Sequence, residues 1–351
     1  MPTLPTQITN LWSPQIWVKE LAEKIVILPG LINSGVCVRT PEMDAIAEGA
    51  GISANVPVFK DVTDSADEPQ VENTAPTNYS VVTSGLMVAP ILNRVCPSSV
   101  TALSAQVSGV DPMGQVISIL GTRRLKQRQA TLVSILRGVF GTGGAANAAA
   151  AFSDCRLGGT TAERFDEKGT DSTADQRVDA GLFIDACFML GELADTLEGG
   201  AFWCHPNIKA ALMKVDADQF KMVQPSGLPF KITTYRGCPI YTSGLLVRAG
   251  TTDGYVYDSY ILTPGSIGWG EKAQAGDEIA VASLQLDKER QKNNQTIYDR
   301  TRFLLHPNGA KWVGTPAGQS ASDSELATAT NWNLALTSAA RAGIVAFRTN
   351  G

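Results

Sequence analysis

The sequence predicts an α+β protein in which one unusually long helix is combined with many strands. Apolar residues at helical spacing run from Pro112 to about Gly138, a length of roughly 40 Å at 1.5 Å per residue. Two β-rich runs, 52–62 and 78–95, lie on either side of an acidic segment. From Lys231 onward strand patterns dominate. The length of 351 residues corresponds to about two domains.

Composition limits the classes of protein that the chain can belong to. The hydrophobic fraction of 44% allows a sizeable core, and the net charge of -5 argues against a basic nucleic-acid binder. Only 18% of the residues are charged, which fits either a surface hidden in contacts or a Gly/Ala/Ser-rich soluble protein. The first cation is Lys19, and no apolar run approaches a membrane span. We therefore expect a cytosolic protein without a secretory signal.

The first 95 residues predict an extended arm. Residues 1–35 contain a short amphipathic piece at helical spacing, and Pro41 precedes a short helix that ends at Glu48. The runs 52–62 and 78–95 predict two strands joined by an acidic tip. An isolated two-stranded ribbon is marginal in water. The ribbon therefore needs a surface, on its own subunit or on a neighbour.

Charge is separated along the chain in a way that suggests contacts between copies. The long helix has no acidic residue, whereas the arm tip is strongly acidic. The basic helix face could be solvated, face DNA or dock an acidic partner, and the acidic arm favours docking. The candidate contact residues are Asp61, Asp64, Asp67, Glu68 and Glu72 on the arm, and Arg123, Arg124, Lys126 and Arg128 on the helix.

The remaining elements follow from local signals. Asp111-Pro112 is a strong helix start, and Gly121 could kink the long helix. Residues 141–174 predict a linker, after which Thr173 and Gln176 fit a capping box for a helix that ends at Gly199-Gly200. A second helix starts at Pro206 and ends near Val215, and a third, near the C-terminus, covers 334–342. The expected strands are 201–204, 232–235, 240–241, 255–262, 279–286, 296–305 and 344–347.

Candidate catalytic and metal-binding residues are sparse. Cys204-His205 is the only Cys–His neighbour pair, but adjacent strand residues point to opposite faces, so a nucleophile–base pair is disfavoured. His205 before Pro206 is more naturally a strand end or helix cap. With two histidines and six scattered cysteines, which we expect to be buried thiols, the sequence predicts no metal site and no cofactor. A soluble hydrolase that uses Cys204 and His205 is the least favoured of the functional hypotheses. We expect that the protein is not an enzyme.

Several stretches occur in an order and spacing that resemble a known family. They are Arg128–Phe140, Leu228–Phe230, Tyr235–Ile240, Tyr257–Tyr260, Pro264–Gly270, Arg302–Trp312, Glu325–Trp332 and Arg348–Gly351. Together they resemble the coat proteins of tailed bacteriophages, which share the lambdoid-phage major capsid fold. The resemblance covers nearly the whole chain.

The resemblance implies a layout for the tailed-phage major capsid fold. Residues 1–48 would be the N-terminal arm and 49–95 the extended E-loop. Residues 96–145 and 272–316 would form the peripheral (P) domain, with the long helix as its spine. Residues 146–271 and 317–351 would form the axial (A) domain and the C-terminal tail.

The resemblance also implies partners. The family forms hexamers and pentamers that close into an icosahedral shell around double-stranded DNA, so we expect weak, non-specific DNA contacts and no membrane. The expected partners are portal and scaffolding proteins, with a decoration protein as an optional one, and the virion would be assembled in the host bacterial cytoplasm. No long helical segment precedes the arm, which implies a separate scaffolding protein or protease, and the start at Met1 argues against trimming. An encapsulin-like bacterial compartment shell is the main alternative.

Overall fold

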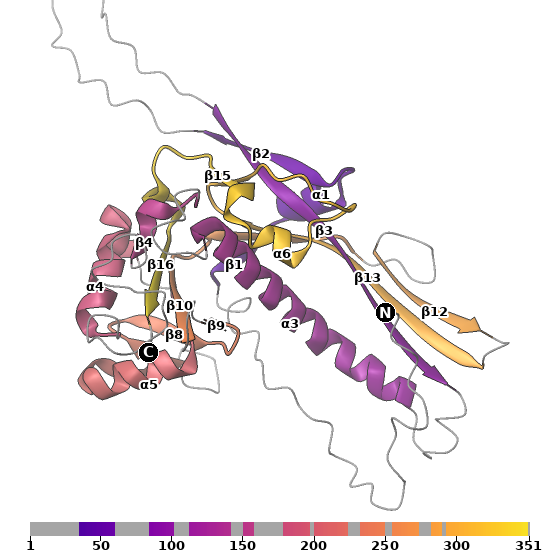
Figure 1. The fold of residues 1–351 in the computed structure, drawn as a ribbon, viewed down its shortest axis with the longest axis horizontal. Helices are drawn as coiled ribbons and strands as arrows, with labels where there is room; N and C mark the ends of the chain where they lie inside the picture. Colours follow the sequence, from indigo (N-terminus) through magenta and orange to yellow (C-terminus); the bar gives the residue numbers. More distant parts are fainter. Residues whose placement is uncertain are drawn as a thin grey trace, which may run out of the picture.

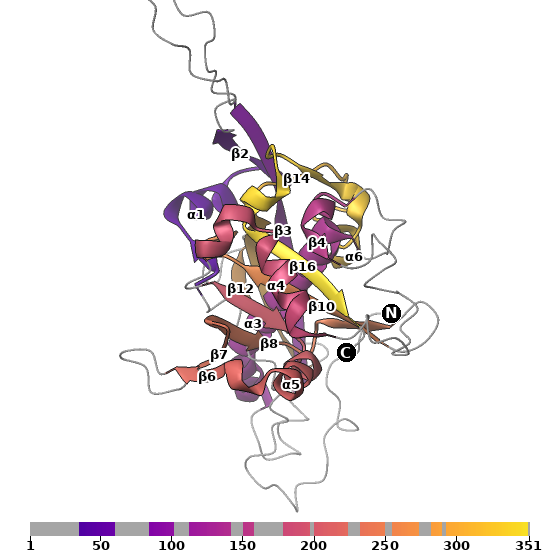
Figure 2. The ribbon, with the colours of Figure 1, turned by 90° about the vertical axis from the view of Figure 1, so that its left-hand side faces the viewer.

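The computed structural model places a long helix between two sheets (Figures 1 and 2), which confirms the predicted α+β class. The structure describes residues 35–59, 84–101, 112–141, 150–157, 178–196, 200–223, 232–249, 255–273, 282–289 and 293–349. Several predictions lie outside these ranges. They are the amphipathic piece before residue 35, the acidic tip with Asp61, Asp64, Asp67, Glu68 and Glu72, the cap at Asp111, and the capping box of Thr173 and Gln176.

A six-stranded sheet contains the predicted arm. Its order is β1-β11-β13-β3-β2, and β12 also pairs with β13. The strands are β1 (Cys37–Arg39), β2 (Ser53–Phe59), β3 (Ser84–Thr101), β11 (Ile267–Glu271), β12 (Ser283–Glu289) and β13 (Asn294–Pro307).

The strand β3 has two different partners along its length. Its first part, Ser84–Pro90, pairs with β2 to form the predicted ribbon. Its second part, Ile91–Thr101, pairs antiparallel with β13. The ribbon therefore does not stand alone, because β3 continues from it into the rest of the six-stranded sheet.

The helix α1 (Pro41–Glu48) packs on this sheet through close backbone contact. Thr40 caps its start by accepting a hydrogen bond from the Met43 amide. A Cβ at Gly270 would lie 2.1 Å from the Met43 carbonyl oxygen, so only glycine lets the helix come this near to β11. At the other end of α1, the buried Arg302 donates to the Ala47 carbonyl at 2.8 Å and also binds the Gly51 carbonyl.

The second sheet has eight strands, in the order β4-β16-β10-β5-β8-β7-β6, and β9 pairs with β10. Two helices, α4 (Ala180–Phe188) and α5 (Pro206–Val215), lie beside it (Figure 2). The strands are β4 (Arg156–Leu157), β5 (Ala201–Cys204), β6 (Phe220–Val223), β7 (Ile232–Tyr235), β8 (Cys238–Thr242), β9 (Val247–Ala249), β10 (Tyr255–Leu262) and β16 (Ile344–Thr349).

The long helix α3 (Pro112–Phe140) runs without interruption for 29 residues, about 43 Å at 1.5 Å per residue. It passes through Gly121 as one helix. Its C-terminal half is buried and shares a core with the eight-stranded sheet through Leu132, Leu136 and Phe140. The short helix α6 (Asp323–Leu326) and the pair β14 (Ala310–Trp312) and β15 (Trp332–Leu334) lie near this half.

Some predicted boundaries are wrong for identifiable reasons. The helix expected from the 173–176 cap starts instead at Ala180, because the Asp179 carboxylate caps it, and it ends at Phe188. The region expected to be a helix at 334–342 begins with the last residue of β15 and ends with a 3-10 turn, Ala339–Ala342, that stops at Gly343 with φ of 72°. Part of the predicted linker forms β4, which pairs with β16. Other 3-10 turns are Ser153–Cys155, Gly191–Thr196, Ala217–Gln219 and Ala329–Asn331.

Two glycines on α3 give a matched stability test. A Cβ at Gly138 would lie 2.0 Å from the Leu326 carbonyl oxygen and 2.6 Å from the Trp332 indole nitrogen, whereas a Cβ at Gly121 would meet nothing within 4 Å. We expect Gly138→Ala to lower the free energy of unfolding by about 1–3 kcal/mol through overpacking. Gly121→Ala should raise it by up to about 1 kcal/mol through helix propensity. Denaturant unfolding of both variants checks this, and a stabilised Gly138→Ala would contradict the packing.

His306 on β13 gives a pH test. It is buried, and burial lowers its pKa from 6.5 to about 4. Between these values the unfolded chain binds the proton and the folded chain does not. Stability should therefore be complete above pH 6.5 and fall by about 3 kcal/mol as the pH approaches 4. In denaturant titrations across this range, His306→Leu should remove this part of the pH dependence, and an unchanged slope in the variant would contradict it.

Candidate functional site: an arginine-lined pocket beside the long helix

A pocket of about 260 Å³ lies between α3 and the strands β3 and β13. Four of its lining residues are arginines, and one is a carboxylate. Leu120 and Phe303 supply apolar walls, and Cys96 supplies a thiol. The residues that line it are Arg94, Val95, Cys96, Leu120, Arg123, Arg124, Gln127, Arg128, Asp299, Thr301 and Phe303.

Two of the helix arginines pair with carboxylates of the six-stranded sheet. Arg124 donates to both carboxylate oxygens of the buried Asp299, at 2.7 and 2.5 Å. Arg128 pairs with Glu271, and its guanidinium lies 5.5 Å from the ring centroids of both Trp269 and Phe303. Burial lowers the pKa of Arg128, and the carboxylate of Glu271 opposes that shift. Both cations are therefore compensated within their own chain.

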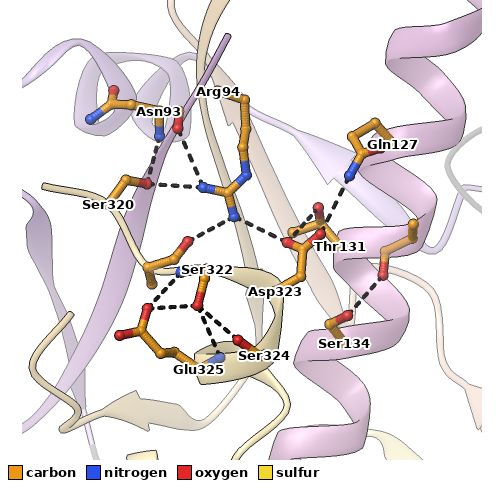
Figure 3. Close-up of polar contacts among 12 residues, drawn as sticks. Asn93, Arg94, Gln127, Thr131, Ser134, Ser320, Ser322, Asp323, Ser324 and Glu325 are labelled. Atoms are coloured by element: carbon orange, nitrogen blue, oxygen red, sulfur yellow. Dashed lines mark hydrogen bonds and ion pairs between the residues drawn. The ribbon is translucent and has the colours of Figure 1, made fainter. Parts of the chain in front are cut away.

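Arg94 on β3 joins the pocket to the C-terminal region (Figure 3). Its guanidinium pairs with Asp323 at 3.0 Å and donates to the hydroxyl of Ser320 and to the Ala321 carbonyl. Asp323 also accepts from Thr131 and Gln127 of α3. This network ties the long helix, β3 and α6 together.

The capping box of α6 stabilises the segment that carries Asp323. The Ser322 hydroxyl accepts from the Glu325 amide, and the Glu325 carboxylate accepts from the Ser322 amide at 2.7 Å (Figure 3). A further bond from the Ala317 amide reaches the same carboxylate. These hydrogen bonds lower the pKa of Glu325.

Arg123 is the pocket arginine without a carboxylate partner among the described residues. Its guanidinium contacts the Cys96 sulfur, and its side chain is exposed. The other three arginines each have a carboxylate partner: Asp323, Asp299 and Glu271. The pocket and its immediate partners thus carry one uncompensated positive charge, which belongs to Arg123.

The structure divides the predicted helix cations into different environments. Arg123, Arg124 and Arg128 line one pocket, and Lys126 does not. Arg124 and Arg128 are held by carboxylates of the six-stranded sheet in the same chain. Sequence reasoning missed Arg94, Asp299 and Glu271. A charged Asp299 inside the apolar pattern of 296–305 was the available signal, since a charge in a half-buried strand needs a partner.

A second arginine cluster lies at the C-terminal end of α3. The buried Asp258 on β10 accepts from Arg137 of α3 at 3.1 Å and from Arg348 of β16 at 3.2 Å, and Arg248 lies 3.6 Å away. Burial alone would raise the pKa of Asp258, but the three guanidinium groups lower it below its usual value. Arg137 also donates to the carbonyls of Leu245 and Val247, so this cluster joins the helix to the eight-stranded sheet.

The structure places Cys204 and His205 in different environments. Cys204 is fully buried, and burial raises the pKa of its thiol to about 12. His205 caps α5, as the sequence predicts, by accepting a hydrogen bond from the Asn207 amide at its Nδ1 atom. Of the six free thiols, Cys96 and Cys187 are half-buried and the other four are buried.

Within the described ranges, no group of three or more His, Cys, Asp or Glu side chains could hold a metal ion. No helix in this part of the chain is both long and apolar enough to cross a membrane.

The sequence matches no protein-family model and no curated protein. Its structure is nevertheless similar to solved structures along almost the whole chain. The capsid of Ralstonia phage GP4 is 10% identical with a TM-score of 0.62, over 99% of this chain and 95% of that one. The capsid of cyanophage Pam1 is 11% identical with a TM-score of 0.57, over 99% of both chains.

A bacterial structure has a similar fold at a lower score. The SrpI encapsulin of Synechococcus elongatus is 12% identical with a TM-score of 0.51, over 93% of this chain and 88% of that one. At these identities the similarity is one of fold. The predicted fold is thereby confirmed: the chain has the α+β fold of tailed-phage major capsid proteins.

Proposed function

We propose that this chain is a structural major capsid protein that assembles into hexamers and pentamers of an icosahedral shell around double-stranded DNA. The observation that supports the proposal is the fold shared with two phage capsids over 99% of the chain. Because the fold is shared along the full length, without an inserted domain, it favours the shell-forming role of those capsids over an added enzymatic activity. On this proposal the protein acts through contacts between copies and performs no catalysis.

Exposed apolar side chains support a protein that works in contact with others. On the ribbon, Ile52 and Leu86 are 46% and 43% exposed, and the ribbon points away from the body (Figure 2). On the second sheet and its helices, Phe188 and Met222 are 70% and 71% exposed. Large apolar groups gain free energy when a neighbour covers them. The ribbon and this region are the surfaces that we expect neighbouring copies to cover.

We assign the parts of the chain by the layout that the resemblance implies. Residues 1–48 are the N-terminal arm and 49–95 the E-loop, which includes the β2–β3 ribbon. The P-domain comprises 96–145 and 272–316, with α3 as its spine. The A-domain and tail comprise 146–271 and 317–351, the part that holds the eight-stranded sheet. The long strand β3 would then cross from the E-loop into the P-domain.

The proposal extends to partners and location. The shell would assemble with portal and scaffolding proteins, and in some particles with a decoration protein, in the cytoplasm of a host bacterium. The chain itself would be part of the virion. Contacts with packaged DNA would be weak and directed at phosphates without sequence preference. A net charge of -5 and three internally paired pocket arginines support weak contact.

An encapsulin-like compartment is the second candidate, since the encapsulin of Synechococcus elongatus has a similar fold. Expression of the chain alone or with its neighbouring genes should give closed particles in sedimentation and negative-stain images. Particles that fill with DNA when a packaging motor is supplied would support a capsid. Particles that instead hold a protein cargo would support a compartment. A small soluble oligomer under all conditions would exclude both.

A single substitution on the ribbon tests whether it makes contacts between copies. Leu86→Glu places a charge on an already exposed position, so the chain should keep its unfolding midpoint but lose most of its assembly into particles. Leu86→Met keeps the position apolar and should assemble normally. Circular dichroism reports folding and sedimentation reports assembly. Normal particles from Leu86→Glu would show that this face of the ribbon is not an interface.

A further inference from the structure

We propose that the arginine-lined pocket is a carboxylate-binding site that receives an acidic side chain from segment 61–67 of a second copy of this chain. The proposal rests on the proposed function, because it needs copies of the chain side by side. It assigns one cation, Arg123, as the group that binds the incoming carboxylate. It also narrows the sequence-based expectation, in which four cations of the helix were candidates.

The charge balance of the pocket selects a single carboxylate. Arg94, Arg124 and Arg128 are matched by Asp323, Asp299 and Glu271, which leaves the guanidinium of Arg123. In the isolated chain, the guanidinium of Arg123 contacts the sulfur of Cys96, which is a weak acceptor. A carboxylate is a far better acceptor for a guanidinium than a thiol is, and it can bind both of the guanidinium nitrogens at once. One incoming Asp or Glu would neutralise the site.

The dimensions of the pocket favour a side chain over DNA. A space of about 260 Å³ admits the end of one acidic side chain together with a few waters. Duplex DNA presents a charge about every 1.7 Å along its axis, so binding it requires a row of free cations. Here the neighbouring arginines are already paired with carboxylates. The pocket therefore suits an acidic peptide.

The length of the chain argues that the carboxylate comes from another copy. The ribbon holds Phe59 opposite Ser84, at its outer end. Along β3, Cys96 lies 12 residues from Ser84, a distance of about 40 Å. Even fully extended, the eight residues from Phe59 to Asp67 span at most about 29 Å. Asp61, Asp64 and Asp67 thus cannot reach their own pocket, so we assign the incoming carboxylate to a neighbouring copy.

The native thiol of Cys96 makes the proposal testable by cross-linking. A disulfide forms only when the two Cβ atoms come within about 4.5 Å, so it reports which segment enters the pocket. Cysteine is introduced in turn at the non-acidic positions Thr63, Ser65 and Ala66, which leaves every carboxylate in place. Assembled particles are then oxidised mildly and run on non-reducing gels. We expect at least one position, such as Ser65→Cys, to give covalently linked dimers.

Matched variants show whether the link depends on the pocket. Cys96→Ser in the same background should abolish the dimer, because the other thiols lie elsewhere. Arg123→Gln should reduce the yield of dimer several-fold, whereas Lys126→Gln, on the same helix but outside the pocket, should leave it unchanged. Equal yields from Arg123→Gln and Lys126→Gln would overturn the role of Arg123.

The remaining outcomes separate this inference from the proposed function. If particles form but no position gives a Cys96-dependent link, or the link lies within one chain, the inference is wrong and the shell proposal stands. If duplex DNA protects Cys96 from a thiol reagent, and does so only when Arg123 is present, the pocket binds nucleic acid and the inference is also wrong. If the unaltered chain forms no particles at all, the proposed function fails first.

Discussion

The arrangement of the whole molecule depends on how the cations of α3 are neutralised. The helix contains no acidic residue, yet Arg128 is buried and Arg124 and Arg137 are largely covered. A buried guanidinium is costly unless a carboxylate meets it. The partners come from different sheets: Asp299 and Glu271 from the six-stranded sheet, and Asp258 from the eight-stranded sheet. The helix can be accommodated only where both sheets present these carboxylates, which fixes the two sheets relative to each other.

Much of the fold could be predicted from the sequence because the signals are local. Proline at the start of α1, α3 and α5, and the run of strand-favouring Tyr, Val and Ile residues in β10, act within a few residues. The site could be predicted only in part. Arg124 and Asp299 are 175 positions apart, and no local pattern states that they meet. The pocket is a product of those distant pairings, so the sequence shows its cations but not which of them remains uncompensated.

The stretches that carry the family resemblance serve packing in this structure. Gly268 and Gly270 let α1 lie against β11, and Arg302 holds the carbonyls at the end of the same helix. Gly309 faces Leu336 so closely that a side chain would collide with it. Residues of this kind are replaced only with difficulty, because each is fitted to a neighbouring backbone. Packing against a neighbouring backbone is thus a physical reason for a restricted choice of residue at these positions.

The double pairing of β3 has a mechanical consequence. The first part of β3 forms the outer ribbon with β2. The second part, Ile91–Thr101, pairs with β13 inside the sheet. Interstrand hydrogen bonds lie perpendicular to the strands. A pull on the ribbon along β3 would therefore load the bonds to β13 together, in shear, and would not peel them apart one at a time. The ribbon can therefore transmit tension along its axis into the body of the subunit, with the load shared among the hydrogen bonds between β3 and β13.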